Sequence, residues 1–163
     1  MAPPVVSNTS PRIALADVGQ LQMLQRLFGD VIIPPAVRAE VLSEPALAEV
    51  PAALKAGWLR MAQPTEAGVI RLLNETLEAG ESEAIALAQQ TSPRWLVLDD
   101  LAARREAEAL GLPIIGTLGV LLLAKEAGLL DSIKPVLDKL RDRTLYIGEA
   151  LYLAVLTSAG EAN

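Results

Sequence analysis

The sequence predicts an α/β fold in which a parallel sheet is covered by helices on both faces. Short aliphatic runs, each about as long as a buried strand, alternate with helical segments from one end of the chain to the other. Hydrophobic residues make up 52% of the chain and aromatic residues only 3%, so the core must be aliphatic. With 163 residues, we expect a single domain, 1–163, because two domains would each be small.

Five segments have the composition of strands, since each is a β-branched or aliphatic run bounded by turn residues. Trp95–Leu98 is the clearest buried strand, and the segment from Trp58 to Ala62 is expected at a sheet edge. The expected strands are Val5-Val6, Val31–Ile33, Trp58–Ala62, Trp95–Leu98 and Pro113–Ile115.

Helices are expected between and after these strands, because apolar residues there recur at helical spacing. Capping residues and proline mark their starts, as at Ser10-Pro11, and glycine marks their ends, as at Gly111 and Gly128. The expected helices cover about 11–19, 21–28, 35–42, 46–56, 65–77, 83–90, 101–110, 117–127, 131–141 and 148–159.

The absence of two residue types narrows the possible chemistry. The chain has no histidine and no cysteine. Zinc sites of the usual kind, Ser-His-Asp catalysis and Cys-His catalysis are therefore excluded, as are disulfides. Any hydrolytic chemistry must depend on carboxylates and a hard metal ion such as Mg²⁺. The lack of cysteine also fits a reducing cytoplasm.

The net charge of −6 repels nucleic acid unless a local basic patch or a metal ion intervenes. The longest apolar stretch, Leu118 to Ala124, is far too short to span a membrane, and the N-terminal MAPPVVSN lacks the basic region of a secretory signal. Basic residues gather between Lys134 and Arg143, but they alternate with acids, as on a solvated face.

Polar side chains directly follow two of the expected strands. Asn8 lies just beyond the first strand, and Asp99 and Asp100 follow the Trp95–Leu98 strand. Chemistry in an open parallel sheet takes place beyond the carboxyl ends of the strands, near the switch in strand order. If these two strands are neighbours, Asn8 and Asp99 face one crevice.

Two glutamates on early helical turns can point toward the same crevice. Glu40 belongs to the helix after the second strand, and Glu83 begins the helix before the fourth. Clustered carboxylates repel one another unless a cation neutralises them, and an oxygen-rich cluster suits Mg²⁺ or Mn²⁺.

Each of these acids also has a purely structural interpretation. Asp100 is well placed to cap the next helix, and Glu81 and Glu83 lie in a first turn, where acids are common. Glu40 is ordinary on an exposed helix, and Thr117 can serve as a cap. Arg104 can pair with Asp100 four residues earlier or reach a substrate phosphate.

Four blocks of the sequence together resemble PIN domains. The resemblance is closest to a mostly uncharacterised prokaryotic PIN-like subfamily related to the VapC toxin ribonucleases, and it covers nearly the whole chain. The last block is the most specific. The blocks are VVSNTSPRIALADVGQL, VIIPPAVRAEV, AGESEAIALA and WLVLDDLAARREAEALGLPIIGTLGVLLLAKEAGLL.

The resemblance implies a three-layer α/β/α fold with a central, mostly parallel sheet of four to five strands. It also implies cleavage of single-stranded RNA with Mg²⁺ or Mn²⁺ held by acidic residues. The implied acidic positions fall on Asn8, Glu40, Glu83 and Asp99, with Asp100 as an alternative to Asp99, while Thr117 takes a further polar position and Ser10 the small hydroxyl position after the first acid.

Two positions depart from the family pattern. Asn8 replaces the usual first aspartate and brings no charge, although its carbonyl can still bind a cation. Arg12 stands where an apolar residue is usual, as a substrate-facing cation or as a surface change without consequence. With Asn8 neutral and Thr117 not acidic, metal affinity should be weaker than in a four-carboxylate site.

The resulting expectation is a cytoplasmic, metal-dependent endoribonuclease, a VapC-like toxin held inactive by an antitoxin. Glu40, Glu83 and Asp99 are its expected catalytic residues, and Ser10, Arg12, Arg104 and Thr117 its expected substrate contacts. The alternative is a PIN-like module that binds nucleic acid or protein with little or no catalysis. The aliphatic helix at 148–159 either packs on the core or forms the interface of an expected homodimer.

Overall fold

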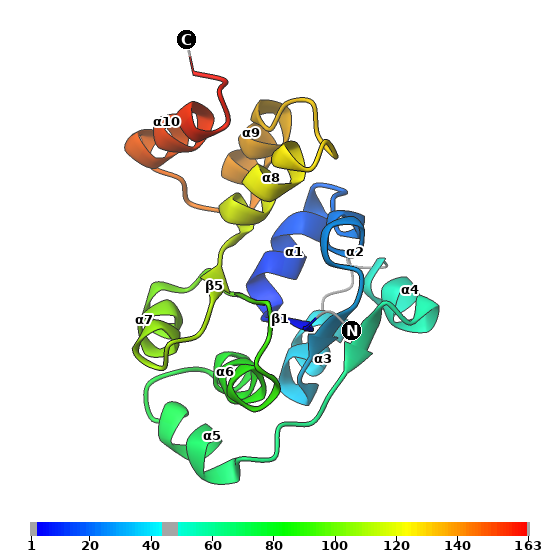
Figure 1. The fold of residues 1–163 in the computed structure, drawn as a ribbon, viewed down its shortest axis with the longest axis vertical. Helices are drawn as coiled ribbons and strands as arrows, with labels where there is room; N and C mark the ends of the chain where they lie inside the picture. Colours follow the sequence, from blue (N-terminus) through cyan, green and yellow to red (C-terminus); the bar gives the residue numbers. More distant parts are fainter. Residues whose placement is uncertain (1–2, 44–48, 163) are drawn as a thin grey trace.

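The computed structural model describes residues 3–43 and 49–162 and contains a five-stranded parallel sheet (Figure 1). The strand order is β3-β2-β1-β4-β5, so β3 lies at an edge as expected. The strands are β1 (Val5–Ser7), β2 (Val31–Ile33), β3 (Leu59–Met61), β4 (Trp95–Val97) and β5 (Ile114–Ile115).

The central strand β1 pairs in parallel with both β2 and β4. Val5 is the Cα partner of Val31 on one side and of Trp95 on the other. The chain moves outward from β1 through β2 to β3, then crosses to the other side of β1 for β4 and β5. The switch in strand order therefore lies between β1 and β4, where an open α/β sheet forms its crevice.

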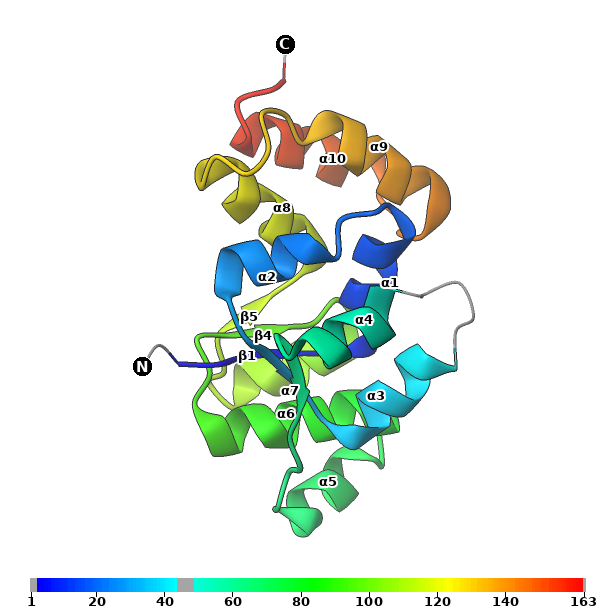
Figure 2. The same ribbon diagram turned by 90° about the vertical axis from the view of Figure 1, so that its right-hand side faces the viewer.

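Helices cover both faces of the sheet, which confirms the three-layer α/β/α expectation. In Figure 2, α1, α2, α8, α9 and α10 lie above the strands, and α5, α6 and α7 lie below them. The helices are α1 (Thr9–Asp17), α2 (Gln22–Phe28), α3 (Pro35–Leu42), α4 (Glu49–Ala56), α5 (Ala67–Leu73), α6 (Ala79–Thr91), α7 (Leu101–Ala109), α8 (Thr117–Glu126), α9 (Lys134–Arg143) and α10 (Glu149–Ser158).

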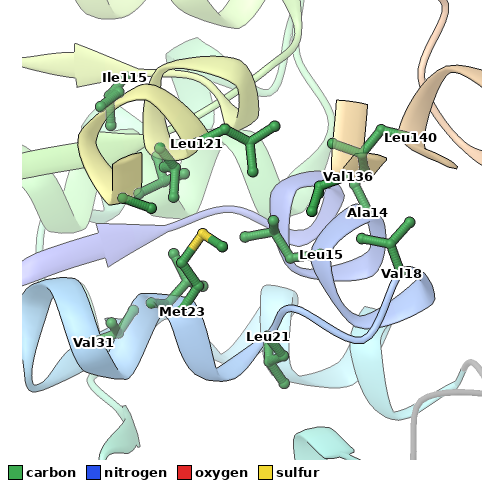
Figure 3. Close-up of a cluster of buried hydrophobic side chains, with 14 of the residues drawn as sticks. Ala14, Leu15, Val18, Leu21, Met23, Val31, Ile115, Leu121, Val136 and Leu140 are labelled. Carbon is green, nitrogen blue, oxygen red and sulfur yellow. The ribbon is translucent and has the colours of Figure 1, made fainter. Parts of the chain in front are cut away.

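The alternation of side chains along the strands separates two hydrophobic cores. Val5 and Ile33 face the larger core, while Val6, Ile32 and Leu96 face the core formed with α5, α6 and α7. Figure 3 shows part of the larger core, where side chains of α1 and α2 meet others from α8 and α9. Aliphatic side chains fill both cores, as the low aromatic content requires.

Several helix starts differ from the sequence prediction. Helix α1 begins at Thr9, one residue before the expected cap Ser10, and Asn8 takes the cap position. Gly80 lies inside the first turn of α6, which begins at Ala79 and not near Glu83. The expected start of α4 near residue 46 lies outside the described residues. None of the described helices has the length and apolar composition needed to cross a membrane.

Glu161 joins the segment after α10 to α8 and to the start of α9. Its carboxylate accepts hydrogen bonds from the amides of Ile133 (2.8 Å) and Lys134 (3.2 Å), from the Ser132 hydroxyl, and from the Lys125 ammonium (2.9 Å). Burial raises the pKa of the Glu161 carboxyl, but these hydrogen bonds outweigh burial and lower it to about 2. One ionised side chain therefore satisfies the first amides of α9, which would otherwise lack partners.

Replacing Glu161 by Gln should lower the free energy of unfolding by about 1.5–3 kcal/mol at pH 7, the usual contribution of a hydrogen bond to a charged group. The folded pKa lies below the unfolded pKa, so this stability is present above the ordinary glutamate pKa of 4.5 and is lost as pH falls toward about 2. In urea denaturation, the difference in unfolding free energy between wild type and variant should become smaller as the pH is lowered from 7. Glu126→Gln, at an exposed carboxylate on α8, is the control, and a difference that does not change with pH would contradict the prediction.

Candidate functional site

An open crevice of about 510 Å³ lies beyond the carboxyl ends of β1 and β4. Helix α1 forms one wall, the two acids after β4 form the floor, and the segment at the end of α9 forms another wall. Its lining residues are Ser10, Ile13, Ala14, Asp99, Asp100, Arg143, Thr144 and Leu145. The crevice therefore lies at the switch in strand order, where the sequence places it.

Asp99 is held in one orientation by Thr117. The Thr117 amide donates to one carboxylate oxygen at 2.7 Å, and its hydroxyl donates to the other at 2.6 Å. A Cβ at Gly116 would lie 2.9 Å from Asp99 Oδ1 and 2.7 Å from Arg104 Nη1, so only glycine lets these two side chains come so close to the backbone. Thr117 is thus a buried positioning residue for Asp99.

Asn8 lies at the end of β1, beside the end of β4. Its amide donates to the Val97 carbonyl at 3.0 Å, which extends the parallel ladder by one step. Its side chain is only 3% exposed, and its Oδ1 atom has no hydrogen-bond partner among the described residues. A buried carbonyl oxygen without a partner is costly, and water or a cation would relieve that cost.

Glu40 packs against the first turn of α6. Its carboxylate accepts a hydrogen bond from the Thr9 hydroxyl, directly after Asn8. A Cβ at Gly80 would lie 2.7 Å from Glu40 Oε1, so only glycine lets the carboxylate lie this close to the α6 backbone. The carboxylate therefore lies at the positive end of the α6 dipole and next to the start of α1.

Glu83 faces the start of α3. Its Oε1 atom accepts a hydrogen bond from the Ala36 amide at 3.2 Å. Ala36, at the start of α3, contacts Glu83, whereas Glu40, later in α3, contacts Gly80 at the start of α6. The two helices therefore run in opposite directions, and each presents a glutamate to the other. Glu83 has a structural task here, because it satisfies a backbone amide in the first turn of α3.

Asp100 caps α7, as its structural interpretation predicts. Its Oδ2 atom accepts a hydrogen bond from the Ala103 amide at 2.9 Å. Glu81 lies beside Asp100. Burial and the Asp100 carboxylate raise the pKa of the Glu81 carboxyl, and they outweigh the hydrogen bond from the Glu78 amide, which lowers it. Glu81 is therefore a second acid near the crevice, which its ordinary first-turn position does not reveal in the sequence.

The structure brings only some of the expected residues together. Asn8 and Asp99 lie at neighbouring strand ends, and Thr9 links Asn8 to Glu40. Within residues 3–43 and 49–162, no three acidic side chains stand close enough to hold one metal ion. The carboxylates thus surround the strand ends in separate hydrogen-bonded positions, and Asp99, Asp100 and Glu83 each accept a bond from a backbone amide.

Arg12 is fully buried, four residues after Asn8 on the same face of α1. None of its three guanidinium nitrogens has a hydrogen-bond partner among the described residues. Burial lowers the pKa of the Arg12 guanidinium to about 9, so the group is still charged at neutral pH. Arg12 is neither a surface change nor exposed to substrate in this conformation. It is a cation within the α1 packing surface.

The remaining expected contacts have mixed placements. Ser10 is exposed and lines the crevice, whereas Arg104 donates to the Leu98 carbonyl at 3.2 Å. Sequence reasoning missed Thr9, whose hydroxyl binds Glu40, although it follows Asn8 directly. It also missed Arg143, because the late basic cluster alternates with acids and its position beside α1 depends on long-range packing.

The oxygen ligands fit a hydrated Mg²⁺ or Mn²⁺ ion better than a closed cage of direct ligands. The Asn8 carbonyl oxygen lacks a partner, and Asp99 presents an oriented carboxylate on the adjacent strand end. Mg²⁺ commonly binds through one or two carboxylates and keeps several waters. The absence of a three-acid cluster among the described residues is compatible with that mode of binding.

The fold and crevice define a class: a three-layer α/β/α protein with polar and acidic residues at the switch between β1 and β4. A family model described as a PIN domain matches residues 4–161. The chain therefore belongs to the PIN domain family. A search of curated proteins finds no match.

Replacing Arg12 by Leu should raise the free energy of unfolding by about 1–4 kcal/mol at pH 7, because it removes a buried charge and restores an apolar contact. The folded pKa of about 9 lies below the ordinary pKa of an arginine, so at pH values between the folded and the unfolded pKa the folded state binds fewer protons than the unfolded state. Wild-type stability should therefore rise relative to the variant above pH 9.

Urea denaturation between pH 7 and pH 10.5 tests this prediction. Arg71→Leu, at an exposed arginine on α5, is the matched control and should have little effect. A less stable Arg12→Leu variant at neutral pH would show that the guanidinium has a stabilising partner.

Proposed function

We propose that the protein is a Mg²⁺- or Mn²⁺-dependent endoribonuclease that cleaves single-stranded RNA, related in role to the VapC toxins. The observation that carries the proposal is the pairing of β1 with β4, because the unpartnered Asn8 carbonyl follows one strand and the Asp99 carboxylate that Thr117 orients follows the other. Membership of the PIN domain family supports the nuclease class. The lack of histidine and cysteine is consistent with chemistry based on carboxylates and a metal ion.

In this proposal, Asn8 and Asp99 hold the ion, and Glu40 lies near them through Thr9. Thr117 fixes both oxygens of Asp99, so no reorganisation of that carboxylate is needed when substrate binds. Thr9 holds Glu40 against the start of α6, where its negative charge is favoured. Glu40 then has an oxygen from which a water near the phosphate can be oriented or deprotonated.

Hydrolysis joins the oxygen of a water to phosphorus and breaks one ester bond of the RNA backbone. One proton of the water must leave, and the departing ribose oxygen must gain one. A bound Mg²⁺ or Mn²⁺ would acidify the water and stabilise the charge on the phosphate. Asp99 lines the crevice, and the parallel pairing of β1 with β4 keeps Asn8 and Asp99 at neighbouring strand ends.

An antitoxin partner, a homodimer and a cytoplasmic location belong to the same proposal. Helix α10 buries Tyr152, Val155 and Leu156 against the core but leaves Leu151 and Leu153 about half exposed, at 48% and 49%. The two exposed leucines are two positions apart, so they lie along the edges of the buried stripe and add apolar surface next to the core contact. We propose that a second copy of the chain covers that surface.

A second function, nucleic-acid binding with little or no cleavage, is favoured by Arg12. A buried positive charge on the same helix face as Asn8 opposes cation binding, and Asn8 itself contributes no charge. Calorimetric titration with Mn²⁺ separates the two functions. Stoichiometric binding that is lost in Asp99→Asn supports the nuclease, and absent binding supports the non-catalytic module.

Replacing Asp99 by Asn should reduce Mn²⁺-dependent cleavage of single-stranded RNA by at least about 100-fold. Loss of a proposed metal ligand should cost more activity than loss of a residue that only orients the ligand, which typically costs about 10- to 100-fold. Thr117→Val should reduce cleavage by about 10- to 100-fold because Asp99 loses its orientation. Glu108→Gln, at an exposed carboxylate on α7, is the control and should keep full activity. Equal cleavage by wild type and Asp99→Asn would exclude the proposed site.

Light scattering at micromolar concentration should give the mass of a homodimer, about twice 17.3 kDa. Leu153→Glu should shift the mass to that of one chain, because a charge at a buried apolar contact is unfavourable. Leu72→Glu, at an exposed leucine on α5, should leave the dimer intact. A wild-type mass of one chain would rule out the dimer.

A further inference from the structure

The wall of the crevice at the end of α9 carries its own positive charge. Arg143 lines the same crevice as Asp99 and Asp100 and is 60% exposed. Its Nη1 atom donates to the Asp17 carbonyl at 2.9 Å, which fixes the side chain along α1, and the Asp17 carboxylate oxygen is 3.9 Å away. The guanidinium is thus held in place while much of it faces solvent, and its other nitrogens can bind an anion.

Tyr146 follows this wall directly, one residue after Leu145, and is 97% exposed. The chain has only five aromatic residues, two of them tyrosines. The other tyrosine, Tyr152, is buried at 7% exposure, donates to Asp138 and lies under the Arg141 guanidinium. A side chain this exposed has almost no packing contact, so packing does not account for a tyrosine directly after the lining residue Leu145.

We propose that Arg143 and Tyr146 form a binding wall for single-stranded RNA, in which Arg143 contacts a phosphate and Tyr146 stacks on a base. This inference rests on the proposed ribonuclease function. A chain with a net charge of −6 needs local attraction to hold RNA above Asp99 and Asp100. Proteins that bind single strands combine a cation for the backbone with an aromatic platform for the bases.

The spacing of the two residues suits one stretch of an extended strand. Arg143 is the last residue of α9, and Tyr146 lies three positions later in the segment before α10; three residues span at most about 10 Å. A phosphate and a nearby base can therefore reach both side chains. The wall also directs the backbone toward the acids on the floor, since Arg143 and Asp99 line the same crevice.

Fluorescence anisotropy with two labelled probes tests the assignment. One probe is a 12-nucleotide oligouridine, and the other is a ribose-phosphate strand of equal length without bases. Excess EDTA prevents metal-dependent cleavage during the titrations. Arg71→Gln and Leu72→Ala, at exposed positions of α5, are the matched controls and should bind like wild type.

Tyr146→Ala should bind oligouridine about 5- to 150-fold more weakly, the range expected for loss of one stacked base, and should bind the abasic strand unchanged. Tyr146→Phe should retain wild-type affinity because it keeps the ring. Arg143→Gln should weaken binding of both probes and reduce the salt dependence of binding by about one phosphate contact.

The inference is overturned if Tyr146→Ala binds oligouridine as wild type does, or if it loses affinity equally for both probes. It is also overturned if wild type binds neither probe, or if Tyr146→Ala loses the dimer in light scattering but not RNA binding. The nuclease proposal is judged separately by Mn²⁺-dependent cleavage in wild type and Asp99→Asn. If wild type cleaves RNA but Tyr146→Ala does not change binding, only the proposed binding wall is rejected. If Tyr146 supports base-dependent binding but wild type does not cleave RNA, only the nuclease proposal is rejected.

Discussion

The parallel pairing of β1 with β4 determines where polar groups can gather in this protein. Both strands are buried on their two faces by helices, so water reaches their ends and not their centres. The ladder continues to the Asn8 amide, which places that residue beside the end of β4. The crevice, its acidic floor and the entry of α1 all follow from this one pairing.

The acids around the strand ends are kept apart by individual partners. Thr117 holds Asp99, Thr9 holds Glu40, and the Ala36 amide holds Glu83. Each contact fixes the direction of its carboxylate and gives it a hydrogen-bond donor of its own. The fold thus places several carboxylates around the strand ends in separate, fixed positions.

The fold could be predicted from the sequence because its signals are local. Aliphatic runs bounded by glycine and proline indicate buried strands, and their alternation with helices requires parallel connections. The position of Asp99 at a strand end follows from the same pattern. Its orientation does not, because Thr117 lies 18 residues away and reaches it only through the pairing of β4 with β5.

Other parts of the site depend on packing that no local pattern contains. Arg143 reaches the crevice because α9 folds back across α1, far away in the chain. An arginine in a helix normally lies on a solvent-exposed face, yet Arg12 lies on a buried face of α1. Glu83 has the residue type of a metal ligand, and only the antiparallel approach of α3 shows that its carboxylate serves a backbone amide.

The close approach of Gly80 to Glu40 has a consequence for reading related sequences. A side chain as small as alanine at position 80 would place its Cβ within 3 Å of both carboxylate oxygens and force the glutamate aside. A homologue could keep every acidic position and still have a rearranged centre if that glycine were replaced. Surveys that judge competence by counting acids alone would therefore overlook a residue that contributes no functional group.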